Sequence, residues 1–352
     1  FTSSMTPRLA IELTSEDLQK KIFPMDLRPQ AHDLITFWLF NTLVKGNLHY
    51  KTNPFRDVAI SGFVTLEGEK MSKSRGNIIE PQSVIEEYGA DALRFWAAGS
   101  KLGDDINYQE KDIVAGKRFV IKIFNAARFV FMNMKGKLEK PKKLYEIDKL
   151  FLAGLNKIIK EATESFEEYE YARCKNDTVN FFWSIFTDNY LELVKKRVYS
   201  PLRIAHSIGH RSEIEQKHRE TEEKESAFYT LYYSLLSILK LMAPFTPFVT
   251  EEIYQKYFKK HEKEKSIHHC SWPSLFELRK DDGDEEKFAL LLEVISKVRH
   301  EKSANKKSVK AEIILTLERD KMKKLKDVLQ DLKAVLNAKE IKEGEFKVEF
   351  VS

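Results

Sequence analysis

The sequence predicts an α/β segment, then a mainly α-helical bundle, and finally a small α+β appendage. Three observations predict this order. Helical and β-rich runs alternate up to about residue 77, and long amphipathic patterns extend from about 111 to 275. A helix–strand–helix–strand pattern closes the chain after the acidic run 281–286, which is typical of a domain boundary.

The α/β segment has helical patterns at 14–23 and 31–46 and a β-rich run at 57–64. These patterns indicate part of an α/β sheet. Residues 78–110 read as a helical connector with a turn at 103–105.

The bundle helices carry Phe, Leu, Ile and Tyr on one face and Lys and Glu on the other. Within them, residues 211–226 are almost wholly polar and predict a loop or a helix end in solvent. The appendage is expected to contain helix 288–304, strand 310–318, helix 320–336 and strand 345–352. The predicted domains are 1–77, 78–110, 111–280 and 281–352.

Composition indicates a soluble intracellular protein of more than one domain. The 352 residues are 42% hydrophobic and 32% charged, enough to bury a sizeable core. No apolar run approaches the roughly 20 residues of a membrane span. The two cysteines predict no disulfide framework and the first residues lack a leader pattern, so we expect a cytoplasmic protein without a membrane.

The most informative motif is KMSKSRGN at 70–77. It follows a hairpin-like run with Gly62 and Gly68 at its turns, and Pro81 then predicts a helix start. Two lysines on a short loop can follow negative charge as it moves from a triphosphate to a leaving pyrophosphate. The motif therefore predicts a loop that handles phosphoryl groups.

This motif resembles the lysine loop of class I aminoacyl-tRNA synthetases, and its surroundings resemble the archaeal-type valyl-tRNA synthetases. The similar stretches lie in family order at 23–43, 102–130, 181–199, 241–255 and 294–313. The leucyl, isoleucyl and methionyl enzymes share the lysine loop, whereas RPQAHD at 28–33 and the run from Leu102 favour valine. The resemblance implies a Rossmann-type catalytic half followed by an anticodon-binding bundle.

The family's second motif, of the type His-x-Gly-His, is not found in residues 1–69. The string HSIGH at 206–210 imitates it but lies far C-terminal to the lysine loop. We therefore expect a C-terminal fragment that lacks the first catalytic half and the inserted editing domain, and that is inactive by itself.

The resemblance assigns Lys70 and Lys73 as catalytic, with charge stabilisation on pyrophosphate as their role. It also implies an ATP site made by residues of the loop and of two segments before it. Those residues are His32, Asp33, Phe63, Val64, Lys70, Met71, Ser72, Lys73 and Ser74. The open alternatives are that the loop is a solvated basic turn and that His32 only caps a helix. Phe63 and Val64 are expected to offer backbone groups to adenine.

Trp38 is implied as a wall of the amino-acid pocket, where an aromatic surface limits side-chain volume, although it also fits a core tryptophan. In the bundle, the resemblance places the anticodon at Asn125, Arg128 and Phe129. An aromatic ring that stacks a base, with Arg and Asn at the base edge, is a common mode of single-stranded RNA recognition. Phe129 fits a core stripe equally well.

A basic series near the C-terminus is expected to contact the phosphates of the tRNA backbone. Such contacts release counterions from the RNA, so binding should depend on salt. It consists of Lys297, Arg299, Lys302, Lys306, Lys307 and Lys310. The residues His261, His268, His269 and Cys270 have no common zinc-site spacing, so we expect no tightly bound metal.

The resulting hypothesis is an ATP-dependent valine–tRNA ligase, which forms valyl-adenylate and transfers valine to tRNA(Val). Its expected partners are tRNA(Val), ATP with Mg²⁺, and valine, and a monomer is expected. The alternatives are a leucyl- or isoleucyl-type synthetase fragment and a non-catalytic tRNA-binding module.

Overall fold

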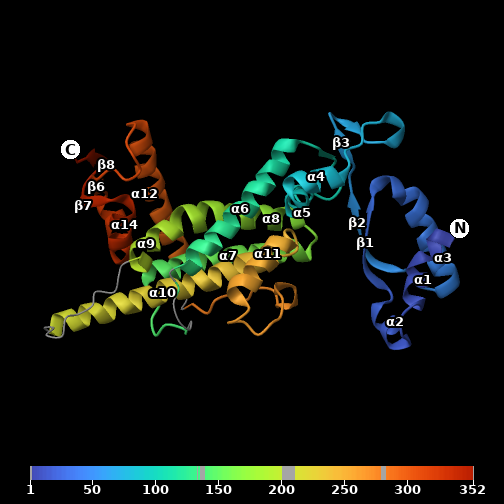
Figure 1. The fold of residues 1–352 in the computed structure, drawn as a ribbon, viewed down its shortest axis with the longest axis horizontal. Helices are drawn as coiled ribbons and strands as arrows, with labels where there is room; N and C mark the ends of the chain where they lie inside the picture. Colours follow the sequence, from blue (N-terminus) through green and yellow to red (C-terminus); the bar gives the residue numbers. More distant parts are fainter. Residues whose placement is uncertain (1, 133, 135–138, 200–210, 279–282, 352) are drawn as a thin grey trace. The chain divides into compact units, whose positions relative to one another are not determined.

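A computed structural model describes residues 2–132, 134, 139–199, 211–278 and 283–351, with the side chains of 211–219 left out. The chain forms two compact units. One contains Phe1–Phe119 with Ser165–Arg173, and the other contains Val120–Glu164 with Cys174–Ser352. Figure 1 shows the ribbon of both units, which are described separately below.

The first unit begins with helices that lead into a βαβ arrangement. Its elements are η1 (Thr2–Met5), α1 (Thr6–Glu12), α2 (Glu16–Ile22), β1 (Met25–Ala31), η2 (His32–Leu34), η3 (Ile35–Leu39), α3 (Phe40–Tyr50) and β2 (Phe55–Ser61). Strands β1 and β2 are parallel, with Met25 opposite Phe55 and Ala31 opposite Ser61. His32 and Asp33 therefore follow directly on the carboxyl end of a parallel strand, where α/β sheets usually place ligand-binding groups.

The lysine loop leaves a second, three-stranded sheet with the order β4-β3-β5. The elements here are β3 (Val64–Leu66), β4 (Glu69–Lys70), η4 (Lys73–Arg75), α4 (Pro81–Tyr88), α5 (Ala90–Ala97) and β5 (Ile106–Asn107). Gly68 has φ +83° in the β3–β4 turn, and Gly103 has φ +85°. A Cβ on Gly62 would lie 2.3 Å from the Asp104 backbone oxygen, so only glycine fits there.

The predicted hairpin, the helix start at Pro81 and the turn at Gly103 are confirmed. The role expected for Gly62 is wrong: Gly62 lies at a close backbone approach, and the hairpin turn is made by Glu67 and Gly68.

The bundle is built from long helices, among them α6, α7 and α10 (Figure 1). Its elements are α6 (Glu110–Met132), α7 (Glu146–Glu167), α8 (Tyr171–Asn180), η5 (Phe181–Tyr190), α9 (Leu191–Tyr199), α10 (Arg211–Met242), α11 (Pro247–Ile253), η6 (Tyr254–Phe258) and η7 (Ile267–His269). Segments η5 and η6 are π-helical. The polar run 211–226 is the first part of α10, which confirms a helix over a loop, and Ser226 at the end of the run is buried.

The appendage packs two helices on a mixed sheet of order β7-β6-β8. Its elements are α12 (Asp284–Ala304), β6 (Ile313–Leu317), α13 (Arg319–Lys324), η8 (Lys326–Val328), α14 (Leu329–Leu336), β7 (Ala338–Glu343) and β8 (Lys347–Phe350). Helix α14 contacts α12 and also α9 of the bundle. The predicted single helix 320–336 is wrong, because η8 interrupts it.

A buried ionic cluster lies in the second unit, at the place where α14 meets the bundle. The Arg197 guanidinium donates to both Asp148 carboxylate oxygens at 2.8 Å, and the Tyr190 hydroxyl donates to Asp148 Oδ1 at 2.6 Å. Arg197 Nε also lies 3.6 Å from an Asp331 carboxylate oxygen. One guanidinium thus serves two carboxylates in a site that is largely closed to water.

The buried Lys302 side chain is the second polar feature of the appendage. Its ammonium group donates to three backbone carbonyls, those of Val309, Ala311 and Leu336, at 2.7–2.9 Å. The three carbonyls belong to the loop before β6 and to the end of α14, so a single side chain ties these segments to α12.

Candidate functional site

The lysine loop is closed by hydrogen bonds within its own segment. Asn77 Oδ1 accepts from the Ser72 amide at 2.9 Å, and the Met71 amide donates to the Val64 carbonyl at 3.4 Å. A single 3₁₀ turn over Lys73–Arg75 ends at Gly76, whose φ is +68°. Glycine adopts this left-handed conformation without steric cost, which explains its place at the turn's end.

Lys70 connects the loop to the end of β1. Its ammonium nitrogen lies 3.3 Å from Asp33 Oδ2 and 3.5 Å from the centre of the Phe63 ring. The His32 ring packs on the same phenyl ring at a centroid distance of 4.2 Å. Four residues predicted for the ATP site, from three segments of the chain, therefore form one exposed cluster around Phe63.

Lys73 differs from Lys70 in its surroundings. It is exposed, and it forms no ion pair or side-chain hydrogen bond with any described residue. The neighbouring hydroxyls of Ser72 and Ser74 lie 3.3 Å apart, and Arg75 is paired with Glu69 at 3.0 Å. The loop thus holds one anchored lysine and one that points into solvent.

The backbone of Phe63 is already engaged within the chain. Its amide donates to Asp105 Oδ1 at 2.6 Å, and its carbonyl accepts from the Ile106 amide at 2.8 Å. The Val64 carbonyl accepts from the loop, and the Val64 side chain is exposed. The phenyl ring of Phe63, more than its peptide groups, is available to a ligand.

Trp38 is half-buried in the π-helical segment η3. The Arg28 guanidinium lies 4.1 Å from the centre of the Trp38 ring, and Phe55 packs beside it at 6.2 Å. The buried Gln30 amide on β1 has no hydrogen-bond partner in the part of the chain that the structure describes. Trp38 as an amino-acid pocket wall stays a prediction.

Helix α6 carries the three residues predicted for the anticodon. Asn125 and Arg128 are exposed, whereas Phe129 is half-buried and meets Tyr199 edge to face at 5.4 Å. From residue 113 to 132 the sequence contains no Asp or Glu but four basic residues. This stretch of α6 therefore carries a net positive charge, and a basic surface is the electrostatic mark of nucleic-acid binding.

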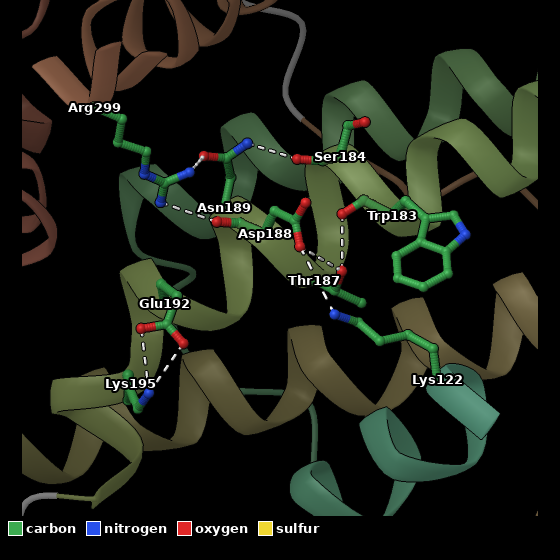
Figure 2. A network of polar contacts seen from close by, with 9 residues as sticks. All are labelled: Lys122, Trp183, Ser184, Thr187, Asp188, Asn189, Glu192, Lys195 and Arg299. Carbon is green, nitrogen blue, oxygen red and sulfur yellow. Dashed lines mark hydrogen bonds and ion pairs between the residues drawn. The ribbon is translucent and has the colours of Figure 1, made fainter. Parts of the chain in front are cut away.

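A polar network beside α6 is shown in Figure 2. Lys122 extends from α6 to within 4.9 Å of the Trp183 ring centre and 3.8 Å of Asp188 Oδ1. Arg299 of α12 donates to Asn189 Oδ1 at 3.0 Å and to the Asp188 carbonyl at 2.9 Å. Burial lowers the pKa of Arg299, while the carboxylates of Asp188 and Glu192 oppose this shift.

The expected basic series 297–310 is wrong in part. Lys302 is buried and saturated by three carbonyls, and Arg299 holds α12 to η5. Lys297 pairs with Glu293 at 2.6 Å, which raises the pKa of Lys297. Lys306, Lys307 and Lys310 are exposed and remain candidates for phosphate contacts.

The string HSIGH at 206–210 lies outside the described residues. Among those that are described, no group of three His, Cys, Asp or Glu side chains is arranged to hold a metal ion. No helix in the described ranges is both long and apolar enough to cross a membrane.

Comparison with known proteins defines the class. Residues 1–109 match the family described as tRNA synthetases class I (I, L, M and V), and residues 148–318 match the anticodon-binding domain of tRNA ligase. The chain belongs to the class I aminoacyl-tRNA synthetases.

Within that class, the relatives are valine–tRNA ligases. The chain is 37% identical to that of Rickettsia rickettsii (strain Sheila Smith), over 99% of this chain and 43% of the relative. It is 38% identical to that of Thermobifida fusca (strain YX), over 89% of this chain and 33% of the relative. The chain thus spans less than half the length of the curated relatives it matches, and the predicted resemblance is confirmed.

Two solved structures share the fold. One is the complex of LeuRS with tRNA and LeuAMS from Agrobacterium radiobacter K84, with a TM-score of 0.54 and 16% identity, over 99% of this chain and 36% of that one. The other is Mycobacterium tuberculosis methionyl-tRNA synthetase with methionyl-adenylate, with a TM-score of 0.54 and 18% identity, over 76% and 52%. The predicted fold class, a catalytic-domain remnant followed by a helical bundle, is confirmed.

Proposed function

We propose that this chain forms the ATP-handling and tRNA-binding part of a valine–tRNA ligase. The reaction joins valine to the α-phosphate of ATP, releases pyrophosphate, and then transfers the valyl group to the 3′ end of tRNA(Val). The observation that carries this proposal is the cluster of Lys70, Asp33, His32 and Phe63 at the carboxyl end of β1.

The two lysines have different tasks in this proposal. Lys70 is paired with Asp33 and Phe63 in the free protein, and it turns from them toward phosphate when ATP binds. Lys73 is unpaired in the described chain and can move with the charge that develops on pyrophosphate. Because such charge stabilisation is stronger in the transition state than in the ground state, Lys73 acts mainly on the rate.

The remaining nucleotide contacts follow from the same geometry. The Phe63 ring offers a flat surface to adenine, and the Asp33 carboxylate can accept hydrogen bonds from ribose hydroxyls once Lys70 turns toward phosphate. The hydroxyls of Ser72 and Ser74, 3.3 Å apart, can donate to phosphate oxygens. Magnesium supplies charge neutralisation on the phosphates when it is bound with ATP.

The amino-acid pocket and the anticodon site complete the proposal. Trp38, braced by Arg28, limits the volume beside β1, which suits a small branched side chain such as valine. Asn125 and Arg128 on α6 contact base edges. The Phe129 ring packs on Tyr199 and is partly buried, so it holds this part of α6 in place beside the base contacts. We further propose that the protein works as a cytoplasmic monomer.

The proposed domains are 1–77 for the catalytic half, 78–110 for the connector, 111–280 for the anticodon-binding bundle and 281–352 for the appendage. Because these residues correspond to 43% of the Rickettsia relative, we propose that they bind tRNA when expressed alone but do not form adenylate.

The test is ATP–pyrophosphate exchange with valine, isoleucine or leucine, in the polypeptide that carries these residues together with the remaining length of its relatives. We expect exchange to depend on valine and to be lost in Lys73→Ala, with exposed Lys101→Ala as the matched control. Preference for leucine or isoleucine, or valine-dependent exchange by residues 1–352 alone, would contradict the proposal.

A further inference from the structure

The lysine loop, residues 70–77, is attached at both ends to segments that pack on the start of α6. Before the loop, β3 pairs in parallel with β5, which leads directly into α6. After the loop, α4 and α5 lie beside the first turns of α6 (Figure 1). The position of the loop therefore depends on how these segments are fixed to one helix.

An apolar cluster holds the segment that leaves the loop. Its buried members are Val84 of α4, Ala92 of α5 and Ile113 of α6, and Ile79 packs against them. Ile79 follows closely on Asn77, whose side chain closes the loop. Apolar contacts are non-directional, so this cluster brings α4 close to α6 but fixes the tilt of α4 only weakly.

The joint between α4 and α5 is a single glycine. Gly89 has φ +93° and ψ +149°, a conformation that is essentially reserved for glycine. Beyond it, α5 is fixed by a close backbone approach, since a Cβ on Gly116 of α6 would lie 2.8 Å from the Ala92 carbonyl oxygen. Helix α4 thus lies between a fixed helix and the lysine loop, with Gly89 as its hinge.

A directional contact lies at the hinge end of α4. The Tyr88 hydroxyl donates to a carboxylate oxygen of Glu110, the first residue of α6. This carboxylate raises the pKa of the Tyr88 phenol, which therefore remains a donor. Lys117 of α6 donates to the Glu87 carbonyl at 3.1 Å and lies 5.5 Å from the centre of the Tyr88 ring. Tyr88 is held at its hydroxyl and on its ring face by the same helix.

The length of α4 amplifies a small movement at this contact. Its eight residues span about 12 Å, so a tilt of about 5° at Gly89 moves the loop end of α4 by about 1 Å. A displacement of about 1 Å in a reacting group can lower a rate about 10²-fold. A contact far from the phosphates can therefore matter for the reaction.

We propose that Tyr88 is a positioning residue for the lysine loop. Its contact with Glu110 sets the tilt of α4 on α6, and this tilt sets where Lys73 lies when ATP is bound. The inference rests on the proposed role of Lys73 in adenylate formation. It adds to that role a side chain from outside the cluster around Phe63.

The first test is amide hydrogen exchange of residues 70–77 in the 352-residue chain. The variants are Tyr88→Phe, which removes only the hydroxyl, Glu110→Ala, and the double variant. Tyr108→Phe is the matched control, because Tyr108 packs against the same apolar cluster and its hydroxyl forms no hydrogen bond with the residues that the structure describes. Amides of α7 report unfolding of the other unit.

The second test is valine-dependent pyrophosphate exchange by the longer polypeptide described above, with the same variants. The kcat of this reaction and its KM values for ATP and valine are measured separately. A merely structural role of Tyr88 would leave kcat unchanged.

We expect the loop amides to exchange on the order of tenfold faster in Tyr88→Phe, while the α7 amides exchange as in the wild type. The double variant should not exceed the larger single effect, because both changes remove one contact. The kcat of pyrophosphate exchange should fall on the order of tenfold in Tyr88→Phe with an unchanged KM for valine, and Tyr108→Phe should resemble the wild type.

The inference is overturned if Tyr88→Phe and Tyr108→Phe have the same loop exchange, or if the two single effects multiply in the double variant. It is also overturned if the loop opens in Tyr88→Phe while kcat stays unchanged. A wild-type polypeptide without valine-dependent pyrophosphate exchange would refute the proposed function instead. Hydrogen exchange in the 352-residue chain would then still decide whether Tyr88 positions the loop.

Discussion

Replacement of Asp331 by Asn should stabilise the protein at neutral pH. Burial raises the pKa of the Asp331 carboxyl to about 6; the nearby Arg197 lowers it, and Asp148 and Glu223 raise it further. The side chain is 22% exposed, and its distance of 3.6 Å from Arg197 Nε is long for a charge-assisted hydrogen bond. Arg197 is already committed to Asp148.

The sign follows from proton linkage. A carboxyl whose pKa is about 4 in the unfolded chain and about 6 in the folded chain binds its proton more tightly when folded. Its contribution to stability is therefore present at low pH and is lost as the pH rises through about 6. Asn cannot ionise, so Asp331→Asn should gain on the order of 3 kcal/mol at pH 7 and roughly half of that at about pH 5.

The assay is urea unfolding followed by circular dichroism at both pH values. Asp320→Asn, at an exposed position of the same appendage, is the control and should change the free energy of unfolding by less than about 0.5 kcal/mol. A loss of stability in Asp331→Asn at pH 7 would show that Asp331 and Arg197 form a net favourable pair. An equal gain at both pH values would refute ionisation as the cause.

Three further predictions concern other sites. Lys302→Met should destabilise the appendage by on the order of 3 kcal/mol, because three carbonyls lose their donor, and a change within 1 kcal/mol in urea unfolding would contradict this. Gly62→Ala should lower the free energy of unfolding by about 1–3 kcal/mol, because the new Cβ clashes with the Asp104 backbone. Gly68→Ala has open space around its Cβ, so this control measures the cost of a positive φ alone. If both variants lose the same free energy of unfolding, the clash at Gly62 is not the cause. Lys73→Ala in the active enzyme should lower the rate of adenylate formation about 10²–10³-fold, with little change in valine affinity by equilibrium titration; the reverse pattern would make Lys73 a ground-state binder.

The sequence was informative where local chemistry decides the conformation. Gly68 requires a left-handed turn, Pro81 starts a helix, and alternating burial in β6 follows an apolar pattern. These features depend on neighbours within a few residues, so they can be predicted from the sequence alone. The loop motif at 70–77 is also local, since its residues are consecutive in the sequence.

Strands β1, β5 and β7 were not predicted, and β1 and β7 were hidden for physical reasons. Strand β1 contains Pro29 and charged residues, and its parallel partner β2 compensates through backbone pairing. Strand β7 reads AKEIKE, and charged residues on an edge strand hide the strand pattern while preventing aggregation.

Contacts between distant residues were also beyond the sequence. Lys302 was expected to bind phosphate because it belongs to a basic series in the sequence. Its burial depends on carbonyls from two other segments, which the sequence does not reveal. The cluster of His32, Phe63 and Lys70 was expected only as a group of ligand contacts, and the cation–ring geometry that joins them required the folded chain.

The absence of carboxylates from most of α6 has a consequence for how the surface forms. Residues 113–132 cannot make the stabilising pairs between Glu and Lys one turn apart, and their four cations repel one another. As an isolated peptide this segment would spend most of its time as coil. Packing against the other bundle helices stabilises the helical conformation of this segment, so the surface proposed to bind RNA forms only when the bundle folds. An RNA that binds this surface binds only the folded chain. It should therefore raise the unfolding temperature, in proportion to the logarithm of the RNA concentration.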